Sequence, residues 1–168
     1  MRERRKMKRV VGRIYRIVMI AMITCGLVLI SLRIAGILVP AVGVGPSMEP
    51  TIESGERYWI IKTGDYQRGD IVSVKLKDGT RITKRIIACP GDELLIGYSN
   101  IWINHEIYPE VYISYENEGW NDFGKYDEKI SLGENKYFVM GDNRKQSLDS
   151  RHFGTIKGEQ ITGKVVGK

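Results

Sequence analysis

The pattern of apolar and polar residues divides the chain into one long apolar run near its start and many short apolar runs after it. Residues 17–39 contain a single charged side chain, Arg33. A bilayer core needs ~20 apolar residues in a helix, and the long stem of an arginine near one interface lets its charge reach water. This run therefore predicts a transmembrane anchor. A cleaved secretory signal, followed by small residues such as Ala41, is an alternative. A buried soluble helix is less favoured, because the rest of the chain is polar.

From residue 57 the apolar runs become short and rich in β-branched residues, and turn residues separate them. Lys77–Gly79 separates two of these runs and predicts a β-hairpin. Residues 116–135 are polar and glycine-rich, and we expect them to form a mobile flap within a small insertion at 97–135. Strands at this spacing predict a mostly-β domain of small antiparallel sheets in a barrel-like fold. The predicted strands are Tyr58–Ile61, Ile71–Leu76, Thr80–Ile87, Leu94–Ile96, Ile101–Ile103, Val111–Tyr115, Tyr137–Met140 and Ile161–Val166.

The basic residues are concentrated at the start of the chain. Residues 1–16 carry eight bases and one acid, whereas residues 34–168 carry 17 bases and 19 acids. Because the basic flank of a membrane span stays in the cytoplasm, the sequence predicts a cytoplasmic basic arm at 1–16, a transmembrane anchor at 17–39 and an extracytoplasmic domain at 40–168. That domain is close to neutral, so a basic surface for nucleic acid is not expected.

Cysteine and histidine are too few and too scattered to suggest a disulfide framework or a metal site. Cys25 lies in the apolar run and Cys89 in the β-rich part, so no disulfide framework is implied. The two histidines, His105 and His152, are far apart in the sequence, and no metal cluster is expected. The sequence predicts no cofactor.

One serine, Ser47, lies in a turn-forming stretch between the apolar run and the β-rich part. Pro46 and Pro50 fix φ near it, and Gly45 permits conformations that larger residues resist. A serine on such a rigid, exposed turn can be a nucleophile. It can equally be an ordinary turn residue, because serine, glycine and proline are common in turns.

A lysine, Lys84, lies in the predicted strand Thr80–Ile87. Alternate residues of a strand share a face, so Lys84 lies on the same face as Ile82 and Ile86. Burial against these isoleucines would disfavour the ammonium form and lower the pKa, as a lysine that acts as a base near neutral pH requires. The alternative is an exposed lysine on an edge strand, since strand lysines are mostly solvated.

Residues 141–151 form a third group of polar side chains, directly after the apolar strand Tyr137–Met140. They read Gly-Asp-Asn-Arg-Lys-Gln-Ser-Leu-Asp-Ser-Arg. Ordinary turn composition explains part of this stretch. It does not explain why a Gly-Asp-Asn-Arg start lies so close to an Asp-Ser-Arg end.

Together these stretches resemble the type I signal peptidases, the membrane-bound serine proteases of family S26 that use a Ser–Lys dyad. The resemblance follows the order of an anchor, Gly-x-Ser-Met-x-Pro-Thr at 45–51, Arg-Gly-Asp-Ile-Val at 68–72, Lys-Arg-Ile-Ile-Ala-Cys-Pro-Gly-Asp at 84–92 and the stretch at 141–151. The ordered set covers most of the chain. It implies a transmembrane helix followed by a mostly-β catalytic domain with the signal-peptidase fold, and the short anchor is similar to the Gram-positive branch.

The resemblance implies a serine endopeptidase in which Ser47 is the nucleophile and Lys84 the general base. The backbone N–H of Ser47 would be an oxyanion donor, because Gly45 stands where Gram-negative relatives have a serine side chain that assists. Supporting roles are implied for Ser147, which would hydrogen-bond and orient the lysine, and for the ion pairs Asp142–Arg85 and Asp149–Arg151.

The resemblance also implies that the substrates are secreted preproteins, cut after an Ala-x-Ala pattern at the outer surface of the lipid bilayer. The pocket walls would include Val44, Met48, Ile52 and Ile82. The chain departs from the family pattern at Lys145–Gln146, where an acidic residue and Asn are usual, and at Ala88–Cys89, where Gly-Leu is usual. These departures suggest a specialised paralogue that cuts a narrow set of preproteins such as pilins.

Other readings of the same residues stay open. Ser47, Asp149 and His152 could form a Ser–His–Asp triad, although His152 lies only three residues after Asp149. A catalytically silent, membrane-anchored relative could bind secreted or pilus proteins without cutting them, but the retention of Ser47, Lys84 and Ser147 favours an enzyme. Self-cleaving repressors share a Ser–Lys dyad, yet they carry a DNA-binding domain where this chain has its anchor.

Overall fold

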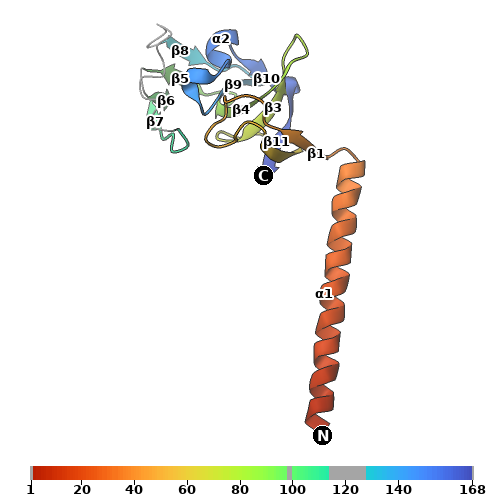
Figure 1. Cartoon of the computed structure of the whole chain (residues 1–168). Helices are drawn as coiled ribbons and strands as arrows, with labels where there is room; N and C mark the ends of the chain where they lie inside the picture. The colour runs from red at the N-terminus through yellow and green to blue at the C-terminus, as the bar shows by residue number, and fades with distance from the viewer. Residues whose placement is uncertain (1, 98–99, 114–127, 168) are drawn as a thin grey trace. The chain divides into compact units, whose positions relative to one another are not determined.

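The computed structural model describes residues 2–97, 100–113 and 128–167. It forms two compact units that divide between Leu38 and Val39. The first unit is built on one long helix and the second on β-strands (Figure 1).

The helix α1 (Arg2–Ile34) contains an apolar segment, Val10–Ile34, of 25 residues. At 1.5 Å per residue this segment is about 37 Å long, which is enough to cross a hydrocarbon core of ~30 Å. Gly36 follows the helix with a φ of +66°, a left-handed conformation that commonly ends helices. The helix thus begins before the first residue of the predicted anchor at 17–39 and ends five residues before its last one, because Gly36 follows the helix and Leu38 begins a strand.

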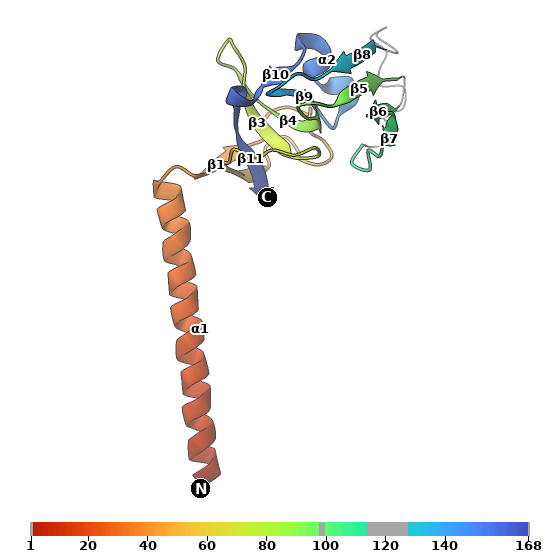
Figure 2. The same ribbon diagram turned by 180° about the vertical axis from the view of Figure 1, so that it is seen from behind.

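The second unit contains two antiparallel sheets. The larger has seven strands in the order β1-β2-β11-β3-β4-β9-β10, and the smaller has four in the order β7-β6-β5-β8. Figure 2 shows the smaller sheet at the end of the domain away from β1 and β11. The strands of the larger sheet are β1 (Leu38–Val42), β2 (Arg57–Ile61), β3 (Ile71–Lys75), β4 (Arg81–Ala88), β9 (Lys136–Met140), β10 (Ile156–Lys157) and β11 (Ile161–Gly167). Those of the smaller sheet are β5 (Glu93–Ile96), β6 (Ile101–Ile103), β7 (Glu106–Tyr108) and β8 (Glu128–Ser131). The short helices are η2 (Arg144–Gln146), α2 (Ser150–Phe153) and η3 (Gly158–Gln160).

The hairpin of β3 and β4 is the element that positions the predicted lysine. Gly79 has a φ of +89° in the connecting turn, which a glycine adopts without steric cost. The strands pair with Val72 opposite Lys84. The predicted hairpin is therefore confirmed, and its register places Lys84 beside a core residue.

Three apolar clusters hold the domain together. One contains Val72, Val74 and Ile86 and lies against one face of the larger sheet. A second, made of Met48, Ile52, Tyr58 and Ile60, lies beneath the turn that carries Ser47. The third joins β4 and β9 to the smaller sheet through Ile87, Ala88, Leu94, Ile96, Ile101, Ile103, Leu132, Phe138 and Met140. The Ser47 turn and β4 are thus both fixed by buried apolar side chains.

The predicted strand Val111–Tyr115 is wrong for its described part, because residues 111–113 form a turn closed by a hydrogen bond from the Ile113 N–H to the Glu110 carbonyl. Residues 114–127 lie outside the described residues, so most of the predicted flap at 116–135 is not described. Its end differs from the prediction, since β8 (Glu128–Ser131) pairs with β5. The sequence also missed β1, β7 and β10, which are two to five residues long and owe their structure to pairing with neighbours.

Candidate active site

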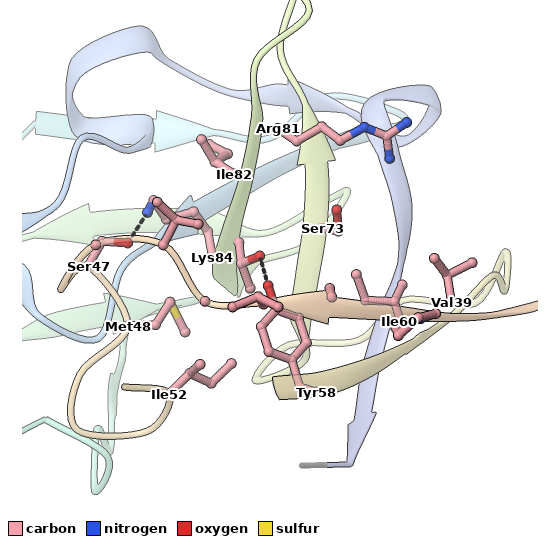
Figure 3. A pocket seen from close by; sticks show the side chains of 17 residues that line it. Val39, Ser47, Met48, Ile52, Tyr58, Ile60, Ser73, Arg81, Ile82 and Lys84 are labelled. Atoms are coloured by element: carbon pink, nitrogen blue, oxygen red, sulfur yellow. Dashed lines mark hydrogen bonds between the residues drawn. The ribbon is translucent and has the colours of Figure 1, made fainter. Parts of the chain in front are cut away.

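Ser47 and Lys84 lie side by side although 37 positions separate them in the sequence. The Nζ atom of Lys84 and the Oγ atom of Ser47 are 2.6 Å apart and hydrogen-bonded (Figure 3). The distance lies within the range in which a proton can pass from a hydroxyl to an amine. The structure therefore brings together the two residues that the sequence singled out as nucleophile and base.

The turn that carries Ser47 is fixed from both sides. Gly45 has a φ of +79°, a conformation that side chains disfavour. Met48, next to Ser47, is buried in the apolar cluster beneath the turn. From the other side, the N–H of Asn143 donates to the Ser47 carbonyl oxygen over 3.1 Å. The serine hydroxyl is thus presented from a backbone that packing and hydrogen bonding both restrain.

Lys84 is buried, with only 3% of its surface exposed. Burial lowers the pKa of its ammonium group, and the charge of Arg151 acts in the same direction. The carboxylates of Asp149 and Asp142 oppose the change only in part. The alternative of an exposed edge-strand lysine is therefore wrong. A lysine in this environment is easier to deprotonate than one in water.

Asp149 and Arg151 form a buried ion pair directly behind the site. Two parallel hydrogen bonds of 2.8 Å join the guanidinium to the carboxylate, and the carboxylate also accepts from the Gly141 N–H. Burial alone would raise the pKa of Asp149, but Arg151 and the Gly141 N–H hold it below its usual range. The pair ties the start of the stretch at 141–151 to its end, which accounts for the spacing seen in the sequence.

Asp142 and Arg85 form the second expected ion pair. The guanidinium of Arg85 donates to both carboxylate oxygens over 2.8 and 2.6 Å, and it also donates to the Gly69 carbonyl. Asp142 is fully buried. Because Arg85 follows Lys84 on β4, this pair joins the strand of the candidate base to the loop after β9.

Ser147 differs from its expected role. Its hydroxyl is buried and forms no hydrogen bond to Lys84 in the described part of the chain, and it helps to hold the pKa of the nearby Asp149 carboxyl below its usual range. It packs instead against Gly141, where a Cβ would collide with both the Ser147 hydroxyl and the Ser47 carbonyl oxygen. Ser147 thus lies between the turn of Ser47 and the buried carboxylate of Asp149, and its contact with Lys84 stays a prediction.

A groove of about 440 Å³ opens beside Ser47 and Lys84 (Figure 3). All four predicted pocket residues, Val44, Met48, Ile52 and Ile82, line it. One wall is the segment 39–45 and the other is the part of β4 from Arg81 to Lys84. Met48 and Ile52 are buried and Val44 is exposed, so the groove has an apolar floor and an open rim.

Sequence reasoning missed a second ionic cluster behind the site. Arg144 is fully buried and donates to the Gly141 carbonyl and to both carboxylate oxygens of Glu110. The ring of Tyr112 lies against the guanidinium of Arg85, 4.0 Å from the ring centre, and also near that of Arg144. Glu110 and Arg144 are 34 positions apart, and no local pattern links them. This cluster attaches the turn after β7 to the loop that contacts Ser47.

The other chemical readings find no support in the geometry. The carboxylate of Asp149 binds Arg151 rather than the imidazole of His152, which lies exposed in α2. The hydroxyl of Ser47 meets Lys84 instead of a histidine. The described part of the chain contains no group of three or more His, Cys, Asp or Glu side chains able to hold a metal ion. Both cysteines are free.

A serine hydroxyl hydrogen-bonded to a buried lysine, on a curled antiparallel sheet, defines a candidate serine peptidase site. Residues 14–167 match the family described as "Signal peptidase, peptidase S26". The chain is 38% identical over 135 residues to signal peptidase I P of Bacillus subtilis subsp. natto, covering 74% of this chain and 72% of that one. It is 33% identical over 145 residues to signal peptidase IB of Staphylococcus aureus strain N315, covering 77% and 76%.

A solved structure agrees with these sequence comparisons. The crystal structure of a signal peptidase I from Enterococcus faecalis V583 superposes with a TM-score of 0.53 at 30% identity, covering 61% of this chain and 97% of that one. The chain belongs to the S26 family of signal peptidases, and it is a serine peptidase with the fold of that family. The predicted family and fold class are confirmed.

Proposed function

We propose that this protein is a membrane-anchored endopeptidase that removes N-terminal signal peptides from secreted preproteins by a Ser47–Lys84 dyad. The observation that carries the proposal is the 2.6 Å contact between the Ser47 hydroxyl and the Nζ atom of a buried lysine. Family membership supports the same reaction, because the relatives it matches are named signal peptidases.

In the proposed mechanism neutral Lys84 takes the proton of the Ser47 hydroxyl while Oγ attacks the carbonyl carbon of the cleaved bond. The backbone N–H of Ser47 stabilises the oxyanion that forms. The Lys84 ammonium then gives its proton to the departing amine, leaving an acyl-enzyme ester. A water loses a proton to Lys84 and attacks the ester, and the proton returns to Ser47 as the signal peptide leaves.

The ion pairs next to the site would hold Ser47 and Lys84 in position relative to each other. Arg85, which follows Lys84, is held by Asp142, and Asp149 is held by Arg151 and the Gly141 N–H. We assign them a positioning role, because neither pair contributes a residue to the described groove lining. Displacing a nucleophile or base by even 1 Å is costly to the rate.

The groove suits an extended peptide with small apolar residues before the cleaved bond. Residues 81–84 of β4 pair with β3 on one side, whereas the pairing with β9 begins only at Arg85. The edge of 81–84 and the edge strand β1 can therefore pair with a substrate main chain by β-augmentation. The apolar floor would accept the alanines of an Ala-x-Ala pattern.

A narrow substrate set, such as pilins, is a further proposal from the two departures in the sequence. Lys145 and Gln146 are exposed, and Ala88 is buried in the core between the sheets. None of these residues lines the groove. The departures therefore do not act through direct contact with a substrate in the groove. Comparing the cleavage rate of a pilin precursor with that of an unrelated preprotein tests the narrow substrate set, and equal rates would contradict it.

We propose that α1 anchors the enzyme with its basic N-terminus in the cytoplasm and residues 40–168 outside. The charge distribution supports this, since basic flanks stay inside. A phosphatase or β-lactamase fused to the C-terminus reports on which side of the membrane the C-terminus lies. A cytoplasmic signal would overturn the orientation.

The test of the activity compares the full-length wild type with Ser47→Ala and Lys84→Ala, using a preprotein with an Ala-x-Ala site in detergent. We expect Ser47→Ala to abolish cleavage and Lys84→Ala to lower kcat/KM by about 10²–10⁴-fold. Ser131→Ala and Lys77→Ala, at exposed positions outside the groove, are the matched controls. If the wild type binds the preprotein without cutting it, the protein is a binding factor; if the variants cut as well as the wild type, the dyad is wrong.

A further inference from the structure

The groove beside Ser47 has an uneven charge. Its lining contains no acidic residue, and its two basic residues are Lys84 and Arg81. Lys84 is buried and hydrogen-bonded to Ser47, whereas Arg81 is exposed. The only strongly basic charge facing solvent from this lining is thus that of Arg81.

Arg81 lies at the opposite end of the groove wall from the dyad. It is three residues before Lys84 on β4, a distance of about 10 Å along an extended strand. By strand alternation it shares a face with Thr83, which hydrogen-bonds the Tyr58 hydroxyl at the floor of the groove over 2.7 Å. Figure 3 shows Arg81 beyond Ile82 and extending away from Ser47.

A second positive charge stands opposite Arg81. Lys75 of β3 is its cross-strand partner, and both side chains are exposed. Like charges directly opposite each other in an antiparallel pair are destabilising. Neither residue forms an ion pair within the described parts of the chain, so an anionic group bound from outside would relieve the repulsion.

We propose that Arg81, with Lys75 behind it, is a specificity-determining residue that selects preproteins with an acidic side chain four to six residues before the cleaved bond. This inference rests on the proposed peptidase function. The apolar part of the groove, with Met48, Ile52 and Ile82, lies near the dyad, and Arg81 lies beyond Ile82 on β4. The small residues before the cut would fill that part, so the chain further upstream would reach the arginine.

The position follows from strand geometry. A substrate paired along β4 advances ~3.3 Å per residue, so its third residue before the cut lies level with Arg81, and the long arginine stem extends beyond that level. A Glu or Asp at the fourth to sixth residue would be attracted and a Lys or Arg repelled. Arg81 would thus discriminate between substrates by the charge of the fourth to sixth residues before the cleaved bond.

The test uses the full-length protein in neutral detergent and peptides with one Ala-x-Ala site that carry Glu, Gln or Lys at the fourth, fifth or sixth residue before the cut. For at least one position the wild type should give kcat/KM in the order Glu above Gln above Lys, with each step about two- to fivefold. The order should collapse in about 1 M salt, where screening is short-ranged.

Two variants and a control decide the assignment. Arg81→Gln should bring the three kcat/KM values together, and Arg81→Glu should reverse their order. Arg57→Gln, on β2 and outside the groove lining, should keep the wild-type order. Equal rates for all three charges in the wild type, or an unchanged order in Arg81→Gln, would overturn the inference while leaving the peptidase proposal intact. Cleavage of none of the peptides, with a preprotein also uncut, would overturn the peptidase proposal itself.

Discussion

Lys84 combines two properties that make it a suitable base, namely burial and contact with a single hydroxyl. A free lysine near neutral pH is almost wholly protonated, because its ordinary pKa is 10.5. Burial disfavours that charge and lowers the pKa. The carboxylates of Asp142 and Asp149 work against this change, and their pairing with arginines limits the effect.

The first prediction concerns pH. If neutral Lys84 is the base, kcat/KM for a peptide should rise about tenfold per pH unit below its pKa and level off above it. Because the pKa is lowered, the midpoint should lie below 10.5. A pH–rate profile of the full-length enzyme measures this, with Lys77→Ala as a control that leaves the midpoint in place. A midpoint at or above 10.5 would contradict the assignment.

Folding stability should report the same ionisation. Between the lowered pKa of Lys84 in the folded protein and 10.5 in the unfolded chain, the unfolded state binds more protons. The free energy of unfolding therefore rises with pH through this window and no longer changes above it. Replacing Lys84 with Met removes this contribution, so the difference in unfolding free energy between wild type and variant should change with pH in that window alone.

The second prediction concerns Gly141, which touches the turn of the nucleophile. An alanine there would push its Cβ into the Ser47 carbonyl oxygen and the Ser147 hydroxyl. We expect Gly141→Ala to cost about 1–3 kcal/mol of stability and to lower kcat strongly, because Ser47 must move. Gly133→Ala is the control, since its Cβ would meet nothing closer than 3.9 Å. Urea unfolding and steady-state kinetics would show both effects, and a fully active Gly141→Ala enzyme would refute this account.

At the scale of elements, the loop after β9 is held by residues distant in sequence. Glu110 neutralises Arg144, whose side chain is fully buried and also donates to the Gly141 carbonyl. The third prediction is that Glu110→Gln destabilises the domain by about 3–5 kcal/mol, because the variant leaves a buried guanidinium without that carboxylate. The exposed Glu106→Gln should change stability by no more than about 0.5 kcal/mol. Equal unfolding curves for the two variants would contradict the role assigned to Glu110.

The local pattern of apolar and polar residues predicted the strands whose side chains alternate between core and surface. It failed where contacts between residues distant in the sequence determine the local structure. The hairpin of β3 and β4 was predictable because Gly79 and the β-branched runs beside it determine it locally. The turn at 111–113 was not, because the ring of Tyr112 lies against Arg85, a contact that only the folded chain creates. The same contrast holds in the site. The flanking isoleucines made burial of Lys84 possible but left an exposed edge-strand lysine open, and only the folded chain shows its burial. No local feature could reveal its hydrogen bond to Ser47, which the family resemblance alone implied.

At the scale of the whole molecule, the chain joins an apolar helix to a β domain with cores of its own. The described apolar side chains of Val10–Ile34 are largely exposed to the surroundings, as suits a lipid environment. The three apolar clusters of the β domain lie wholly within residues 39–168. We therefore expect the β domain to fold and to cleave substrates without the helix, and we expect the helix to hold the enzyme at the membrane.

The last prediction separates these two tasks. A chain beginning at Ile37 keeps all of β1 and every residue of the groove, so it should fold cooperatively and cut a short soluble peptide with a kcat/KM close to that of the full chain. Against a preprotein embedded in lipid vesicles it should be slower by about 10²–10⁴-fold, because the anchor supplies a high effective concentration at the membrane. Dissolving the vesicles in detergent removes that advantage and should bring the two enzymes together. If the shortened chain fails to cut the soluble peptide, the helix contributes to the site itself. If it cuts the embedded preprotein as fast as the full chain, the anchor does not serve to present the substrate.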